Sequence, residues 1–415
     1  MSDISKLIEA RNRHISKAMS IAHGSPLHIV KGEMQYLYSS DGSKYLDLVN
    51  NVSHVGHCNP VVVNAGQRQM AILNTNSRYL FEGLTDYISR LADTLPADLS
   101  VGFLLNSGSE ANELAIRLAR AYTGNHDIAV IEGAYHGHTG MLIELSPYKF
   151  RGPGGKGHPE PWVRVLPIPD SYRRAGNDFL LEAEMTFDRG GNVAGVLVET
   201  MLSCAGQIPL PTGYLQGLQD MTKRKGGLLI ADEVQVGFGR VGTHMWAFEE
   251  TGVVPDIVVM GKPIGNGHPM AAVFTTAEIA SSFRGMEFFS TFGGNPVSCA
   301  IGMAVMDVLE EEELLSKALK HGSQFKNGLD ELMKTHDIIG DVRGRGLFLG
   351  IELVKNRETL DPAIQEASDF VDNMRDLGVL LSTDGPMHNV IKIKPPMVIS
   401  QQDIDDTLAK IDLSL

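Results

Sequence analysis

Two ionisable residues in the middle of the chain, Asp232 and Lys262, each come shortly after a short apolar segment. Residues 228–230 (LLI) precede Asp232, and residues 257–260 (IVVM) precede Lys262. Short apolar segments bounded by turn residues are typical of buried strands in a parallel sheet. Because ligands of open α/β sheets bind outside the carboxyl ends of the strands, we expect the acid and the amine to face one crevice.

An amine and a carboxylate in one crevice are the two groups that pyridoxal 5'-phosphate needs. The amine holds the aldehyde of the cofactor covalently, and the carboxylate keeps the ring nitrogen protonated and the ring electron-withdrawing. Lys262 would be the amine and Asp232 the carboxylate. Taken alone, the pair is better explained as two unrelated polar residues at strand ends, where such residues are common.

A second candidate site lies in residues 102–124 (GFLLNSGSEANELAIRLARAYTG). We predict a strand over 103–105, a turn through Ser107 and Gly108, and a helix that opens at Ser109. A small-residue turn at a helix N-terminus offers free backbone N–H groups and the positive end of the helix dipole, and both favour a phosphate group. Taken alone, this turn is better explained as a capped helix without a ligand, with Ser109 as the N-cap.

Composition limits the class of protein. The 415 residues are 43% hydrophobic and 21% charged, as expected of a soluble globular protein with two lobes. No apolar segment approaches the ~18 residues that span a bilayer, and the first 17 residues lack the apolar core of a secretory signal. The net charge of −14 argues against nucleic acid as a partner. Three dispersed cysteines fit neither a disulfide framework nor a zinc site, so we expect a cytoplasmic protein without a metal.

Periodicity predicts alternating helices and strands along the rest of the chain. The expected elements are a helix within 1–30, a hairpin over 32–50, strands at 127–132, 194–200 and 271–275, and helices at 214–224, 296–310, 363–377 and from residue 401 onward.

Two longer motifs resemble a known family. Residues 231–242 (ADEVQVGFGRVG), followed by a strand and residues 261–269 (GKPIGNGHP), are similar to the cofactor-binding segment of the class III (ω-amino-acid type) aminotransferases. The resemblance extends from about Tyr38 to the C-terminus. It implies the α/β architecture of PLP-dependent transferase fold type I, with a mostly parallel central sheet in the large domain and an α+β small domain. The implied division is 1–55 for a segment joining the small domain, 56–300 for the large domain and 301–415 for the small domain.

The resemblance also assigns roles to residues around pyridoxal 5'-phosphate. Lys262 is the catalytic amine, Tyr135 stacks on one face of the ring, and Val234 lies on the opposite face. The equivalent of Thr291 reaches the cofactor phosphate of the other subunit, which implies a homodimer with shared sites. The full set of implied cofactor-binding residues is Ser107, Gly108, Ser109, Tyr135, Glu199, Asp232, Val234, Gln235, Lys262 and Thr291, with Gly108 and Ser109 at the phosphate and Gln235 at the phenolic oxygen.

Finer similarity points to a reaction. NNVSHVGHCNP, LNTNSRYL, SPYKFR, LSCAGQIPLPTGY, TFGGNPVSCA and NVIKIKPPM resemble the ethanolamine-phosphate and phosphohydroxylysine phospho-lyases of this family, and the related (R)-1-hydroxy-2-aminoethylphosphonate ammonia-lyases. The implied activity is elimination from a small primary amine bearing phosphate or phosphonate, with release of ammonia and an aldehyde. An ω-aminotransferase using a keto-acid acceptor is the alternative, and a catalytically silent binding protein is a third possibility. Whether phosphate or hydroxide leaves stays open.

A dianionic substrate needs local cations in a protein of this charge. Arg78 and Lys392, or Lys394 two residues later, are candidates because cationic side chains bind phosphate oxygens. Each is equally consistent with a solvated or ion-paired surface side chain. Asn51 is the further candidate substrate residue. A lysine near the paired prolines, where related aminotransferases often carry an arginine, weakens the prediction of a carboxylate clamp.

Overall fold

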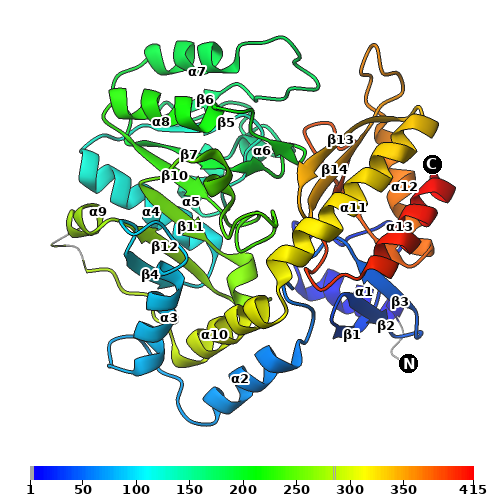
Figure 1. Cartoon of the computed structure of the whole chain (residues 1–415), viewed down its shortest axis with the longest axis horizontal. Coiled ribbons are helices and arrows are strands. Elements are labelled where there is room, and N and C mark those ends of the chain that lie inside the picture. The colour runs from blue at the N-terminus through cyan, green and yellow to red at the C-terminus, as the bar shows by residue number, and fades with distance from the viewer. Residues whose placement is uncertain (1–3, 284, 286) are drawn as a thin grey trace.

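The largest element of the fold is a seven-stranded sheet. The computed structural model describes residues 4–283, 285 and 287–415. The sheet occupies the left lobe of the molecule in Figure 1. Among the described strands of this sheet, β12 alone runs in the direction opposite to the others, so the predicted α/β class with a mostly parallel sheet is confirmed. The strand order is β4 (Val101–Leu105), β12 (Ala271–Thr275), β11 (Ile257–Met260), β10 (Leu228–Asp232), β7 (Gly195–Glu199), β5 (Ile128–Ile131) and β6 (Val163–Leu166).

Apolar side chains cover both faces of the central strands. In β10, Leu228 and Ile230 join the hydrophobic core on one face, and Leu229 and Ala231 join the core on the other. Helix α4 (Gly108–Thr123) packs on the first face and α8 (Tyr214–Arg224) on the second. Because burial of a leucine or isoleucine side chain contributes ~1.5–3 kcal/mol, this continuous apolar segment holds β10 in the middle of the sheet.

The register of the parallel strands sets the positions of three ionisable residues. Asp232 pairs with Glu199 of β7 and with Val259 of β11. Lys262 lies two residues beyond the end of β11 at Met260. Since these strands are parallel, all three residues come out at the same carboxyl edge of the sheet.

Helix α4 starts directly after the β4 turn. The N-cap is Ser107, whose hydroxyl oxygen accepts a hydrogen bond from the backbone N–H of Glu110. The sequence interpretation of Ser109 as the cap was therefore wrong by half a turn, because Gly108 is already helical. The helix ends at Gly124, whose φ of 69° is the left-handed conformation that glycine adopts without a Cβ clash.

Two four-stranded sheets form the right lobe of Figure 1. The N-terminal hairpin of β2 (Tyr36–Ser39) and β3 (Lys44–Asp47) pairs with β15 (Val379–Leu380) from near the C-terminus. The first sheet is completed by β1 (Ile29–Glu33), and the second has the order β13 (Ile339–Arg345), β14 (Phe348–Leu353), β17 (Val390–Ile393) and β16 (Ser382–Asp384). The domain boundaries after residues 55 and 300 stay a prediction.

The remaining elements are mostly helices. No helix within the described ranges is long and apolar enough to cross a membrane. Their bounds are α1 (Ile4–His14), α2 (Pro60–Met70), α3 (Glu82–Ala92), α5 (Gly140–Leu145), α6 (Pro147–Phe150), α7 (Phe179–Asp188), α9 (Ala277–Ser281), α10 (Pro296–Glu311), α11 (Leu314–Thr335), α12 (Ile364–Asp376) and α13 (Gln401–Ser414), with short 3-10 turns at Ala247–Thr251 and Lys262–Gly265 and a small ribbon of β8 (Met201–Leu202) and β9 (Ile208–Pro209).

Candidate active site

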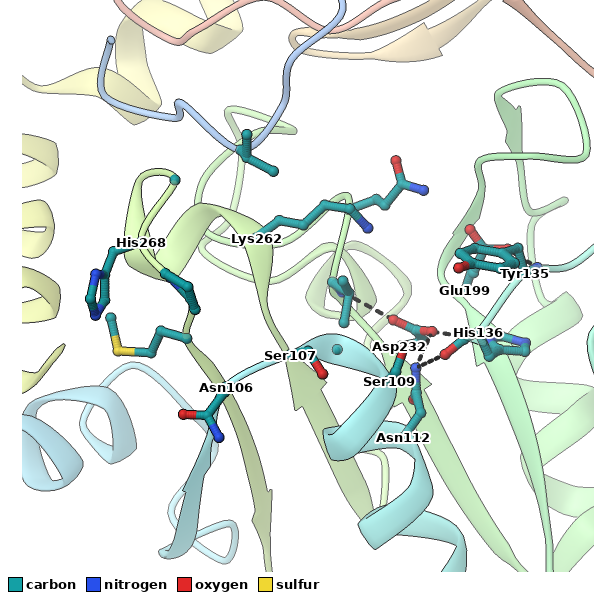
Figure 2. Close-up of a pocket in the computed structure, with 18 residues that line it drawn as sticks. Asn106, Ser107, Ser109, Asn112, Tyr135, His136, Glu199, Asp232, Lys262 and His268 are labelled. Carbon is teal, nitrogen blue, oxygen red and sulfur yellow. Dashed lines mark hydrogen bonds and ion pairs between the residues drawn. The ribbon is translucent and has the colours of Figure 1, made fainter. Parts of the chain in front are cut away.

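A cavity of about 350 Å³ opens at the carboxyl edge of the seven-stranded sheet. Its walls come from the β4–α4 turn, the segment after β5, the ends of β7 and β10, and the segment after β11 (Figure 2). The structure brings together nine of the residues predicted to bind the cofactor, which are Ser107, Gly108, Ser109, Tyr135, Glu199, Asp232, Val234, Gln235 and Lys262.

Lys262 extends into this cavity from a strained position. Its φ of 32° lies in the left-handed region, which costs a residue with a side chain ~1–3 kcal/mol and is found mainly at functional sites. Desolvation lowers the pKa of the Lys262 amine, and the nearby Asp232 partly opposes that effect. The lowered pKa favours the neutral amine, which is the form that attacks an aldehyde or accepts a proton.

The Asp232 carboxylate is buried and held by three donors. Its Oδ2 lies 2.7 Å from Nδ1 of His136 and 2.9 Å from Nδ2 of Asn112, which donates to it. Its Oδ1 accepts from the backbone N–H of Val234 at 3.1 Å. Figure 2 shows the contacts of Asp232 with His136 and Asn112 as dashed lines. These donors keep the carboxylate in one orientation at the floor of the cavity.

Sequence reasoning missed His136 and Asn112. Asn112 lies one helical turn after Gly108, so the two share a face of α4, and His136 directly follows Tyr135. The helical spacing was the available signal for Asn112. For His136 the sequence carried no signal, because only the packing of the β5 segment against β10 turns its ring toward Asp232.

The turn that is predicted to bind phosphate is closely packed against Val234. A Cβ on Gly108 would lie 3.0 Å from Val234, and one on Gly261 would lie 3.2 Å from it. The Ser109 hydroxyl accepts from the backbone N–H of His138 at 3.3 Å. First-turn N–H groups of a helix have no intrahelical acceptor, so those of Gly108 and Ser109 are available to an anion.

A hydrogen-bonded chain runs along the rim from Gln235 to Glu199. The Gln235 Nε2 donates to the Ser203 hydroxyl at 2.8 Å, and that hydroxyl donates to Oε2 of Glu199. Burial raises the pKa of Glu199, an effect partly opposed by His136. The Gln235 Oε1 accepts from Asn51 Nδ2 and from Lys394 Nζ, each at 3.0 Å. The predicted substrate residue Asn51 thus lies next to the cavity, in contact with a residue that lines it.

Four of the predicted residues are absent from the cavity lining of the single chain, and Asn51, which contacts Gln235, is one of them. The exposed Arg78 pairs with Glu287 at 2.6 Å and stacks on the Phe289 ring at 4.3 Å. Lys392 pairs with Asp384 at 3.3 Å. Thr291 is exposed. The substrate and cofactor roles of Arg78, Lys392 and Thr291 stay predictions.

Comparison with known proteins identifies the family. The model for "Aminotransferase class-III" matches residues 19–415. The chain belongs to the class III aminotransferase family. It is 47% identical to the Drosophila melanogaster "Alanine--glyoxylate aminotransferase 2-like" protein, over 97% of this chain and 85% of that protein. It is 41% identical to the Caenorhabditis elegans "Ethanolamine-phosphate phospho-lyase homolog 1", over 96% of this chain and 90% of that protein.

A solved structure resembles this chain over almost its whole length. The phospholyase from Arthrobacter in complex with phosphoethanolamine superposes with a TM-score of 0.93 at 38% sequence identity, covering 98% of this chain and 99% of that one. The protein is therefore a class III aminotransferase-family enzyme that depends on pyridoxal 5'-phosphate.

The chemical groups that line the cavity fit this cofactor. Asp232 is a buried carboxylate for a protonated ring nitrogen, the start of α4 offers N–H groups for the phosphate, and Lys262 offers an amine with a lowered pKa. When bound, pyridoxal 5'-phosphate withdraws the electrons left behind when the carbon bearing the substrate amine loses a proton. The protein residues would supply the rest, because the Lys262 amine is placed to accept that proton and the Asp232 carboxylate to pair with a protonated ring nitrogen.

We expect Lys262→Ala to abolish the visible absorption of the cofactor-loaded protein and to lower turnover by at least about 10²- to 10⁴-fold, because the covalent amine and the base are one residue. Absorption spectra and initial rates test this. Lys223→Ala, which changes an exposed lysine of α8, should leave both unchanged. An unaltered visible band in Lys262→Ala would show that another amine holds the cofactor.

His136→Ala should weaken cofactor binding by about 10- to 100-fold, since a hydrogen bond to a charged group contributes ~1.5–3 kcal/mol. Cofactor titration of the apoprotein measures this. His57→Ala is the matched control, because His57 also contacts an aspartate, Asp47, at 2.7 Å but lies away from the cavity lining. Equal losses in both variants would mean that the effect of His136 is on general stability.

Proposed function

We propose that the protein is an elimination lyase that acts on a small primary amine bearing a phosphate or phosphonate group, and that it releases ammonia and an aldehyde. The observation that supports this best is the similarity, over nearly the whole chain, to a phospholyase in complex with phosphoethanolamine. The name of the Caenorhabditis elegans relative agrees with the same substrate class.

The chemistry required of the chain is modest. Lys262 removes a proton from the carbon that bears the amine, and the C–O bond to phosphate on the next carbon then breaks with its electron pair. Water hydrolyses the resulting enamine to an aldehyde and ammonia. Phosphate is a stable leaving anion and needs cations more than it needs a proton donor, whereas hydroxide needs an acid.

Lysines rather than an arginine carry the positive charge near the paired prolines. Lys392 pairs with the buried Asp384, and Lys394 contacts Gln235 at the cavity rim. A single ammonium is a compact point charge, while an arginine fork matches the two oxygens of a carboxylate. The lack of an arginine in residues 390–397 therefore weakens the case for an amino acid substrate held by a carboxylate clamp.

A second candidate activity is that of an ω-aminotransferase. The 47% identity to a relative named as aminotransferase-like supports it. The same Lys262 would then return the proton to the cofactor carbon, and a keto acid would be needed to complete the cycle. Transamination requires a keto-acid acceptor, whereas elimination does not.

We also propose that two copies form a homodimer with shared active sites. Thr291 lies within an exposed segment that contains the apolar Phe289 and Phe292. Arg78 stacks on Phe289, and Leu80, which follows closely, is fully exposed. Apolar side chains clustered on a surface in this way are characteristic of a protein–protein interface.

The lyase activity predicts stoichiometric release of ammonia and inorganic phosphate from ethanolamine phosphate without any keto acid. Coupled assays for ammonia, phosphate and acetaldehyde measure it. Ammonia release from a hydroxylated aminoethylphosphonate, with no inorganic phosphate, would identify the ammonia-lyase variant of the proposal. Turnover that appears only after pyruvate or glyoxylate is added would instead establish an aminotransferase.

Arg78→Ala should raise KM for ethanolamine phosphate by about 10- to 100-fold while the cofactor spectrum stays intact, because a charged hydrogen bond to phosphate contributes ~1.5–3 kcal/mol. Steady-state kinetics measure KM and kcat separately. Arg224→Ala is the control, since Arg224 is an equally exposed arginine in a 2.7 Å pair with Glu184. An unchanged KM in Arg78→Ala would remove this residue from the substrate site.

A further inference from the structure

Lys394 is a buried cation at the rim of the active site. Its exposed fraction is 1%, and its backbone follows β17 directly. The ammonium Nζ lies 3.0 Å from Oε1 of Gln235 and 4.4 Å from the centroid of the Phe348 ring. Among the described residues, no carboxylate forms an ion pair with it. Burying an unpaired charge costs free energy, so the contact of this ammonium with Gln235 points to a functional role.

The contacts of Gln235 fix the orientation of its carboxamide. A glutamine has one carbonyl oxygen with two lone pairs and one amide nitrogen with two hydrogens. Asn51 and Lys394 occupy both lone pairs of Oε1, and Ser203 accepts one hydrogen of Nε2. Because Gln235 also lines the cavity, the remaining group that it can offer there is the second N–H.

The lysine and the asparagine are not equivalent in this arrangement. Asn51 could rotate its own amide and present its oxygen, after which Gln235 could turn over as well. An ammonium has three donors and no acceptor. Lys394 can therefore form a hydrogen bond only with the carbonyl oxygen of the Gln235 carboxamide. Its charge also polarises the amide and makes the opposite N–H a stronger donor.

We infer that Lys394 is a positioning residue, which holds the Gln235 carboxamide so that an N–H rather than a carbonyl faces the cofactor. The charge of Lys394 is thereby transmitted to the phenolic side of pyridoxal 5'-phosphate without direct contact. This role applies equally to a lyase and to an aminotransferase.

The geometry argues against a role for Lys394 as a direct ligand of the substrate. Its side chain is absent from the cavity lining, and Gln235 lies between the ammonium and the cavity. Burial lowers the pKa of Lys394 to about 7. Asp384, Cys204 and Glu199 favour its charged form, and Lys392 opposes it. Lys392 has Asp384 as its direct partner, at 3.3 Å.

The test is a pH titration of the visible absorbance of the holoenzyme without substrate. Lys394→Met keeps the length and apolar volume of the side chain but removes the charge. We expect the midpoint of the titration to rise by about one pH unit, because loss of a nearby positive charge and of a polarised donor favours the protonated form of the bound cofactor. Lys392→Met should shift the midpoint by less than half as much, since Asp384 already neutralises that charge.

A double-mutant cycle separates positioning from other effects. In a Gln235→Leu background, Lys394→Met should add no further shift, because the group through which it acts is gone. Equal shifts in both backgrounds would overturn the inference and make Lys394 a direct electrostatic partner. A raised KM with an unchanged midpoint would overturn it in favour of a substrate ligand. If Lys394→Met does not fold, Lys394→Leu supplies the same test, because leucine also lacks a donor, and its unchanged midpoint would likewise overturn the inference.

Discussion

The buried carboxylate of Asp232 is the constraint on which the rest of the active site depends. Removing an ionised carboxylate from water costs several kcal/mol unless donors replace the solvent. His136, Asn112 and the backbone of Val234 replace it. These donors come from three separate elements, so the sheet, α4 and the segment after β5 must meet in one arrangement for the charge to be tolerated. The same arrangement leaves Asp232 in the lining of the cavity, where it would pair with a protonated ring nitrogen of the cofactor.

Gln235 has a comparable role at the rim. Its carboxamide contacts Asn51 from the N-terminal segment, Ser203 from the large lobe and Lys394 from the C-terminal lobe. A displacement of either small sheet would therefore alter the hydrogen bonds of a residue that lines the cofactor cavity.

Strain and desolvation act together on Lys262. A left-handed φ and burial both cost free energy, and the sheet and the packing of Val234 between Gly108 and Gly261 supply the compensation. The result is an amine of lowered pKa in a fixed place. Because this device serves any reaction that begins with removal of a proton next to an amine, the groups at the rim must distinguish elimination from transamination.

The order of the helices and strands followed closely from the sequence. The helix expected at 296–310 is α10 (Pro296–Glu311), and that expected at 363–377 is α12 (Ile364–Asp376). These predictions succeeded because proline at a helix start and apolar periodicity act locally. The cap of α4 was misplaced because two serines flank Gly108 and either satisfies the local rule.

The sequence by itself determined the fold class and the alignment of Asp232 and Lys262 with two strand ends, since both depend on short apolar segments and the turns that follow them. Only the tertiary structure decided which side chains contact Asp232 and Gln235. His136, Ser203 and Lys394 lie 96, 32 and 159 positions from their respective partners. Contacts over such separations depend on how the elements pack, and no local pattern of residue types specifies them.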